Sequence, residues 1–322
     1  MNMERRRFNR EILQYSLLGF AGVGMISCID TSNKEKASPS KKGEMFFKLS
    51  LAQWSFHKAL QANEMDHLDF AAKAKNLGFD GIEYVNQFFK DKAEDMTYLH
   101  QMNVKAASAG VKQLLIMIDG EGSLATLDKK ELSQSIDNHK KWVDAAAILG
   151  CHSIRVNCHG EGGREDVSSA GIEGLSKLSE YAAKQSVNII VENHGGYSSD
   201  GEWMANVISQ VGMENCGMLP DFGNFCIERE GGVMWGAPCI KEYDKYKGIK
   251  ELMPYAKALS AKSFDFDEQG KETTIDYKKI LRIVKASGYT GYIGVEYEGE
   301  NLSEEEGIIK TRDLLISTSK EI

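Results

Sequence analysis

The chain has 322 residues, of which 42% are hydrophobic and 27% are charged, and its 39 basic and 47 acidic side chains give a net charge of −8. This composition supports a full hydrophobic core and excludes a disordered tract. It also argues against a protein that grips nucleic acid, because counterion release needs a basic surface, and no apolar run reaches the roughly 20 residues of a membrane span.

The first 27 residues have the organisation of an export signal. A twin-arginine pair within residues 5–7 precedes a moderately apolar stretch over residues 12–26, as in signals of proteins exported in the folded state. Residues 25–28 (MISC) resemble a lipoprotein cleavage box that would leave Cys28 lipidated. We therefore predict a twin-arginine or lipoprotein-type signal peptide over residues 1–27. The protein would be exported, and it would be periplasmic or would touch the membrane only through the lipid on Cys28. A disordered basic N-terminus is the alternative.

Residues 28–44 are polar and predict a linker, so the folded domain is expected over residues 45–322. If Cys28 is lipidated, the other five cysteines form an odd set without CxxC spacing. This argues against a disulfide framework and a structural zinc site, and we expect small buried side chains instead. The six cysteines are Cys28, Cys151, Cys158, Cys216, Cys226 and Cys239.

From Phe46 onward, short apolar or β-branched runs alternate with longer helical patterns. Eight runs are typical of strands, and their starts are about 30–40 residues apart, the length of one βα unit. These runs are Lys48–Trp54, Gly81–Val85, Gln113–Ile118, Ser153–Cys158, Asn188–Asn193, Cys216–Asp221, Ala258–Phe264 and Tyr292–Tyr297. The rhythm predicts a single (β/α)8 TIM barrel. A doubly wound sheet is the competing fold, but the glycine fingerprint of nucleotide sites is missing after the first strand.

Amphipathic stretches between the strands predict helices, and glycines before the next strand supply left-handed C-caps. The clearest stretches are Asp66–Leu77, Ser133–Leu149 and Tyr277–Ala286, the last with Asp276 as a plausible N-cap, and the capping glycines are Gly78, Gly150 and Gly288. The segment Ile227–Ile249 breaks the rhythm after the sixth strand. It reads either as a lid over the barrel mouth or as a passive surface excursion.

The carboxyl ends of the predicted strands and the residues just after them supply polar side chains, at the end of a barrel where catalytic residues lie. They are Gln53, His57, Glu83, Asn157, His159, Glu192, Asn193, His194, Asp221, Asn224, Lys262, Asp265, Glu296 and Glu298. Glu192, Asp221 and Glu296 each follow a strongly apolar strand and would repel one another unless a cation lies between them. Carboxylate oxygens suit Mg²⁺ or Mn²⁺. Separate ion pairs with Arg155 or Lys262 are the alternative.

Four motifs in order carry a family resemblance, and Gly81-Ile82-Glu83 near the second strand adds to it. They are residues 189–195 (IIVENHG), 219–224 (LPDFGN), 262–265 (KSFD) and 293–297 (IGVEY). The chain resembles the sugar phosphate isomerase/epimerase family of xylose-isomerase-like TIM barrels from Phe46 to about Leu315. The resemblance implies a divalent metal, Mn or Mg with Zn as the alternative, held by Glu192, Asp221 and Glu296. It also implies that Glu192 and Glu296 move protons at adjacent sugar carbons.

The sequence departs from the family at one metal ligand. The family carries a histidine on its seventh strand, whereas this chain has no histidine beyond His194 and has Ser260 at the expected position. Three outcomes follow from this difference. The metal stays on the three carboxylates with Asn224, His194 or water filling in, the Lys262 ammonium supplies the positive charge, or only sugar binding survives.

Histidines and aromatic residues near the strand ends are candidates for substrate contact. The predicted substrate-binding set is His57, Glu83, Asn157, His159, His194 and Lys262. We expect Trp54, Phe56, Trp203 and Trp235 to be able to stack on a sugar, Trp142 to lie in the core, and His67, His100 and His139 to be solvated on helices.

The sequence as a whole predicts a sugar isomerase or epimerase that abstracts a proton next to a carbonyl and passes through an enediolate stabilised by a divalent metal. A 3-keto-glycoside lyase or hydrolase on the same barrel is one alternative, and an inactive sugar-binding lipoprotein is another. Phosphodiester cleavage is a poorer match, because the histidine-rich cluster of the nucleases with this barrel is missing. The expected partner is a small sugar or glycoside and not nucleic acid, and a homo-oligomer stays open.

Overall fold

The computed structural model describes residues 45–322. The predicted signal peptide, Cys28 and the predicted linker lie outside the described residues. Within the described part, every helix is too short or too polar to cross a bilayer.

Eight parallel strands form one sheet, in the order β6-β5-β4-β3-β2-β1-β10-β9. The strands are β1 (Lys48–Ala52), β2 (Gly81–Val85), β3 (Lys112–Met117), β4 (Ser153–Val156), β5 (Asn188–Glu192), β6 (Cys216–Leu219), β9 (Leu259–Ser263) and β10 (Tyr292–Tyr297). The chain just after β6 closes the sheet onto β9, since Ser260 N donates to Pro220 O at 3.0 Å and Phe222 N donates to Ser260 O at 3.0 Å. The result is the predicted TIM barrel.

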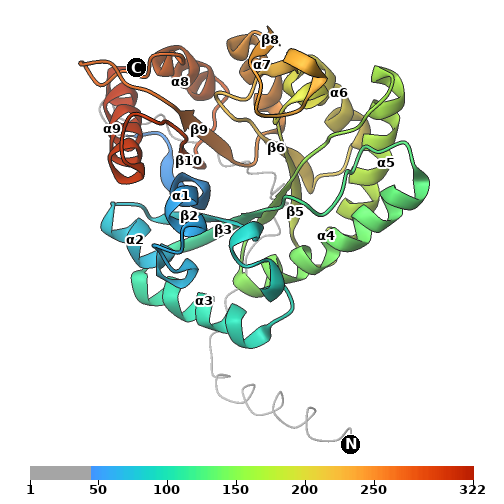
Figure 1. Cartoon of the computed structure of the whole chain (residues 1–322), viewed down its shortest axis with the longest axis horizontal. Coiled ribbons are helices and arrows are strands. Elements are labelled where there is room, and N and C mark those ends of the chain that lie inside the picture. The colour runs from blue at the N-terminus through green and yellow to red at the C-terminus, as the bar shows by residue number, and fades with distance from the viewer. Residues whose placement is uncertain (1–44) are drawn as a thin grey trace, which may run out of the picture. The chain divides into compact units, whose positions relative to one another are not determined.

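Helices surround the strands (Figure 1). They are α1 (His57–Gln61), α2 (Phe70–Asn76), α3 (Met96–Ala109), α4 (Lys129–Leu149), α5 (Arg164–Ala183), α6 (Gly201–Val211), α7 (Lys245–Leu252), α8 (Tyr277–Ala286) and α9 (Glu304–Glu321). The side chain of Asp276 caps α8 by accepting a hydrogen bond from Lys279 N at 2.9 Å, as predicted. Gly150 ends α4 with φ of 71°, a left-handed conformation that favours glycine.

The apolar side chains form two layers because residues in a strand alternate between faces. The larger layer lies between strands and helices and includes Ile189 and Val191 of β5. The smaller layer fills the barrel interior and consists of Ala52, Val85, Leu115, Met117, Ile190, Leu219 and Ala258. Polar side chains at the other inward-facing positions, such as Lys262 of β9, are buried above or between these apolar groups.

Several strands are shorter at their carboxyl ends than the sequence predicted, although β2 and β10 are not. The first strand ends at Ala52, and Gln53–Phe56 forms a 3-10 turn. Likewise β4 ends at Val156 and β6 at Leu219. These predicted strands end about two residues too late, because the loops that follow the strands are also buried. These loops carry the polar side chains of the barrel mouth.

The segment after β6 forms a small antiparallel hairpin outside the barrel sheet. Its strands are β7 (Cys226–Arg229) and β8 (Cys239–Glu242), and a disulfide joins Cys226 to Cys239 with the two Cα atoms 5.9 Å apart. The prediction that the cysteines do not form disulfides is wrong for this pair, because strand pairing brings together residues whose spacing gave no signal. The other described cysteines, Cys151, Cys158 and Cys216, are free and buried.

Two histidines predicted to be solvated are buried instead. His67 lies among the aromatic rings of Tyr84, Phe89 and Tyr98, and its Nδ1 lies 2.9 Å from Gln53 Nε2. His139 lies on the inner face of α4, with Nδ1 2.7 Å from Ser135 O. Both side chains find backbone or amide partners, which lets a helix bury them; His100 is exposed as predicted.

Candidate active site

A cavity of about 690 Å³ opens at the carboxyl ends of the strands. Side chains from most of the barrel loops and from the hairpin line it. They include Trp54, His57, Gln87, Asp119, Arg155, Asn157, His159, His194, Asn224, Arg229, Trp235, Lys262, Phe264, Glu296, Glu298 and Glu300. Five of the six residues predicted to bind substrate are among them. The sixth, Glu83, is not.

The three carboxylates singled out from the sequence come together next to this cavity, and Glu296 is one of its lining residues. Glu192 ends β5, Asp221 follows β6, and Glu296 lies in β10, and one oxygen of each lies within 4.8 Å of the others. All three are buried, with exposed fractions of 2%, 0% and 4%. Such a concentration of buried negative charge requires protonation, a counter-charge or a cation.

Asp221 is the carboxylate with a free oxygen. Its Oδ1 accepts hydrogen bonds from Gly223 N and Asn224 N, both at 2.8 Å. Its Oδ2 is buried and has no partner. Burial raises the pKa of Asp221 to about 6, although the nearby Lys262 ammonium lowers it.

Glu192 has two neighbours that supply positive charge or a proton. Arg155 Nε lies 2.9 Å from Glu192 Oε2, an ion pair that lacks hydrogen-bond alignment, and Asn224 Nδ2 donates to Oε1 at 3.0 Å. Burial, more than any charge, raises the pKa of Glu192 well above its ordinary value, and Glu296 and Asp221 add to the rise.

Glu296 is held by two residues of β9. Ser260 Oγ donates to Glu296 Oε2 at 2.9 Å, and Lys262 Nζ donates to Oε1 at 3.2 Å. Lys262 also donates to Glu298 Oε1 at 3.0 Å. Burial alone would lower the pKa of Lys262, but the surrounding carboxylates, Glu296 first, raise it well above its ordinary value, so the ammonium is charged.

The cluster and the separate ion pairs predicted as its alternative therefore coexist. Arg155 pairs with Glu192 and Lys262 pairs with Glu296, while Asp221 forms no ion pair with any residue in the described range 45–322. Ser260 is fully buried between strands, bridged to Asp221 and bonded to Glu296. It stands where the sequence placed the missing histidine of the family.

A chain of hydrogen bonds fixes the protonation of His194. Asp119 Oδ1 accepts from Arg155 Nη1 at 2.8 Å and from Asn157 Nδ2 at 2.7 Å. Asn157 therefore turns its oxygen to His194 Nδ1, 2.9 Å away, which must carry the proton. Burial, with Arg155 next, lowers the pKa of His194 well below its ordinary value. The imidazole is neutral and its Nε2 is an acceptor.

Glu83 lies inside the barrel rather than in the mouth. Its Oε1 accepts a hydrogen bond from Ser50 Oγ at 2.6 Å, and its Oε2 is buried without a partner. Gly294 makes room for it, because a Cβ there would lie 2.6 Å from both carboxyl oxygens. Burial raises the pKa of Glu83 to about 8, so the group is protonated at neutral pH. Its predicted role in binding substrate stays a prediction, and the side chain is not among those that line the cavity.

Only some of the aromatic residues predicted to stack on a sugar line the cavity. Trp54 and Trp235 line the cavity, whereas Phe56 and Trp203 are buried against helices and cannot meet a ligand there. Trp142 lies in the core as predicted.

Several residues of the mouth were not predicted from the sequence. Asp119 follows the third predicted strand directly and carries the same signal as the other strand-end residues. Arg229 comes from the hairpin, and Gln87 comes from a turn after β2. Nothing in the local sequence marks these two residues, because their place in the cavity depends on how the loops fold back.

The chain matches a known protein family over most of its length. A family described as xylose isomerase-like TIM barrel matches residues 71–318. The chain belongs to the xylose isomerase-like TIM barrel family. The resemblance found in the sequence motifs is thus confirmed. A sequence search of curated proteins finds no significant match.

Solved structures of the xylose isomerase-like fold superpose over most of this chain. A 3-keto-D-glucoside 4-epimerase from E. coli is 12% identical, with a TM-score of 0.64 over 84% of this chain and 99% of that one. An L-ribulose 3-epimerase is 14% identical, with a TM-score of 0.63 over 85% and 96%. The IOLI protein with a bound zinc atom is 15% identical, with a TM-score of 0.63 over 85% and 99%. At these identities the likeness establishes the fold.

Proposed function

We propose that this protein is an enzyme that isomerises or epimerises a sugar by moving a proton next to a carbonyl group. The observation that carries the proposal is the buried cluster of Glu192, Asp221 and Glu296 at the mouth of a barrel of this family. Structures with the same fold include a 3-keto-D-glucoside 4-epimerase and an L-ribulose 3-epimerase, which supports a sugar substrate.

The donor set fits a divalent cation. Asp221 Oδ2 is buried without a partner, and the cluster offers carboxylate oxygens alone, the ligands that Mg²⁺ and Mn²⁺ prefer. Zinc is a weaker fit, because it favours nitrogen and sulfur ligands. Glu192, Asp221 and Glu296 would hold the ion, which when bound polarises the carbonyl oxygen and offsets the negative charge of an enediolate.

Glu192 and Glu296 are the residues proposed to move the proton. A hydrogen on the carbon next to the carbonyl leaves as a proton to one carboxylate, and its bonding electrons form the double bond of the enediolate. Return of the proton to the opposite face of that carbon gives an epimer, whereas return to the neighbouring carbon gives an isomer. Burial raises the pKa of Glu192, so this carboxylate, once ionised, is a stronger base than an ordinary glutamate.

Lys262 and His194 are proposed to hold the substrate oxygens. The Lys262 ammonium borders the cavity beside Glu296 and can donate to an enediolate oxygen. The neutral His194 can accept a hydrogen bond from a sugar hydroxyl through Nε2, while Asn157 holds Nδ1.

A second candidate function is cleavage of a 3-keto-glycoside. Proton abstraction is the same, but the glycosidic oxygen on the carbon β to the carbonyl leaves with its bonding electrons and is protonated, which yields an unsaturated keto sugar and an alcohol. A second cavity of about 360 Å³, which shares His159 with the first, supports this candidate because it offers space for a leaving group.

We also propose that the protein is exported and anchored by a lipid on Cys28. The N-terminal motifs that motivate this lie outside the described residues. The disulfide between Cys226 and Cys239 supports export, since disulfides form and persist in oxidising compartments.

Metal content and solvent deuterium uptake test the enzyme proposal. The wild-type protein is expected to bind about one Mn²⁺ per chain and to exchange deuterium into keto sugars at the carbon next to the carbonyl. Asp221→Asn, which keeps the volume and the Oδ1 contacts, is expected to lose metal and to slow exchange by orders of magnitude, because it removes one of three charged ligands.

Asp265→Asn is the matched control, since Asp265 also follows a barrel strand but lies outside the cluster and the cavity lining, and it is expected to keep both properties. Exchange in the wild type that survives full chelation would contradict the metal assignment. No exchange with any keto sugar, together with retained sugar binding, would instead favour an inactive sugar-binding protein, in which the Arg155–Glu192 and Lys262–Glu296 ion pairs are structural.

A further inference from the structure

The tip of the β7–β8 hairpin carries exposed apolar side chains, and Trp235 among them lines the large cavity. Val233, Met234 and Trp235 have exposed fractions of 48%, 37% and 44%. Exposed apolar groups in one short loop are costly in water and mark a place where something binds.

Several contacts hold this loop in one shape. The Arg229 guanidinium donates to Met234 O at 3.2 Å and to Ala237 O at 2.8 Å, and it lies 6.0 Å from the centre of the Trp235 ring. The disulfide joins the two strands at the base of the loop. Trp235 is therefore exposed but fixed in place.

Trp235 rests on the segment that follows β5. Its ring centre lies 4.3 Å from that of His194 and 6.1 Å from that of His159. Gly195 allows this approach, since a Cβ there would lie 3.1 Å from Trp235 Cη2 and 3.0 Å from Met234 Sδ, and its φ of +88° also favours glycine. The hairpin tip and the residues after β5 thus fit together closely.

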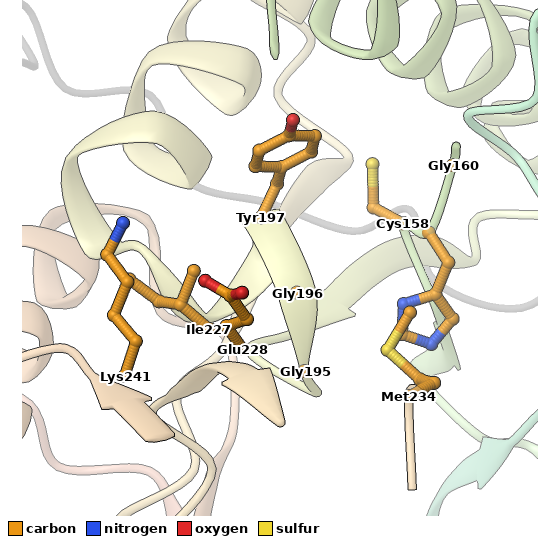
Figure 2. A pocket seen from close by; sticks show the side chains of 10 residues that line it. Cys158, Gly160, Gly195, Gly196, Tyr197, Ile227, Glu228, Met234 and Lys241 are labelled. Atoms are coloured by element: carbon orange, nitrogen blue, oxygen red, sulfur yellow. The ribbon is translucent and has the colours of Figure 1, made fainter. Parts of the chain in front are cut away.

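The same tip borders two cavities. Trp235 lines the large cavity of the carboxylates, and Met234 lines the smaller one of about 360 Å³. Figure 2 shows Met234, Tyr197, Glu228 and Lys241 around this smaller cavity. His159 belongs to both linings, so the two spaces adjoin at the tip.

A second aromatic platform stands across the mouth. Trp54 follows β1, lines the large cavity, and is backed by His57 with the rings 4.9 Å apart and 12° from parallel. In the closed order of eight strands, β1 and β5 are four positions apart and so lie on opposite sides. The carboxylates come from β5, the end of β6, and β10, which lie on the arc between the two platforms.

We propose that Trp235 forms a second sugar subsite, so that the substrate is a glycoside of at least two sugar units rather than a single ring. Aromatic faces stack on the C–H faces of sugars, and one ring cannot stack on platforms at opposite sides of the mouth while it also reaches the carboxylates. The reaction of this glycoside rests on the proposed function. Its binding at Trp235 does not, because a sugar that cannot react can still bind there.

Calorimetry on the full chain tests the subsite with unreactive probes: glucose and a panel of α- and β-linked glucose disaccharides. At least one disaccharide is expected to bind about tenfold tighter than glucose, as one well-stacked ring contributes. Trp235→Ala is expected to remove this preference and to leave glucose affinity within about twofold. Ile240→Ala, on the exposed face of β8 outside both cavity linings, is the control and should change neither affinity.

The absence of any disaccharide preference in the wild type, including the absence of measurable binding, overturns the proposal. So does an equal loss of glucose and disaccharide affinity in Trp235→Ala. These outcomes are distinct from a failure of the proposed function, which would appear as disaccharide binding at Trp235 without deuterium exchange into any keto sugar.

Discussion

The Glu83 carboxyl lies inside the barrel, where burial raises its pKa to about 8 against an ordinary value of 4.5. A carboxyl of this kind binds its proton more tightly in the folded chain than in the unfolded one. The free energy of unfolding should therefore fall as pH rises from about 4.5 to about 8.

Glu83→Gln is expected to remove this part of the pH dependence, because the amide keeps an acceptor for Ser50 and cannot ionise. Urea unfolding in chelator at pH 5, 6.5 and 8 measures the free energy of unfolding. Between pH 5 and pH 8 this free energy should fall by on the order of 2–4 kcal/mol less in Glu83→Gln than in wild type. Glu64→Gln on the surface is the control. Parallel curves for wild type and Glu83→Gln would mean that Glu83 ionises as freely when folded as when unfolded.

The clustered carboxylates could be predicted from the sequence because each comes directly after an apolar run of a strand. Glu192, Asp221 and Glu296 were found in this way, and the structure brings them together. The same rule misplaced Glu83, because a residue in mid-strand can face the barrel interior and stay there as a neutral acid.

At the scale of single elements, the hairpin of β7 and β8 is the part of the fold least tied to the barrel. All of β8 is exposed, and β7 is only partly covered. The disulfide is therefore the main constraint on its shape, together with Arg229.

Replacing both cysteines (Cys226→Ser with Cys239→Ser) is expected to loosen the hairpin and leave the barrel folded. Limited trypsin digestion should cut after Arg229 or Lys241 at least several-fold faster than in wild type, because local opening exposes the backbone. Mass spectrometry locates the cuts, and circular dichroism checks the barrel. Equal cleavage rates would show that Arg229 and the packing of Trp235 suffice to hold the hairpin.

The sequence predicted β2, β10 and α8 with the bounds that the structure has. Clear signals in the sequence mark the limits of these elements, such as the Asp276 N-cap at which α8 begins. The hairpin could not be predicted, because its strands are short, polar and stabilised by a disulfide that joins residues 13 apart in sequence. Its position over the mouth depends on Gly195 and His194, which lie far from it in sequence.

For the molecule as a whole, the export proposal links the N-terminal residues to the disulfide. Replacing Arg5 and Arg6 by Lys is expected to keep the precursor in the cytoplasm, because the receptor of twin-arginine signals reads the guanidinium pair. Cell fractionation measures the effect. Protein retained there should carry Cys226 and Cys239 as free thiols, which alkylation before mass spectrometry detects.

A variant with Cys28→Ala serves as the companion to this experiment, since it should still be exported but should no longer sediment with membranes. Unchanged export of the Arg5→Lys, Arg6→Lys variant would mean that residues 1–27 are not a twin-arginine signal.

The barrel closes beside the proposed metal site. Between β6 and β9, backbone hydrogen bonds join Ser260 to Pro220 and Phe222, the two residues on either side of Asp221. Asp221, a proposed metal ligand, lies on one side of this junction, and Ser260, which donates a hydrogen bond to Glu296, lies on the other. A metal bound at the proposed site is therefore expected to stabilise this part of the barrel wall and to slow hydrogen exchange at the backbone amides of Phe222 and Ser260.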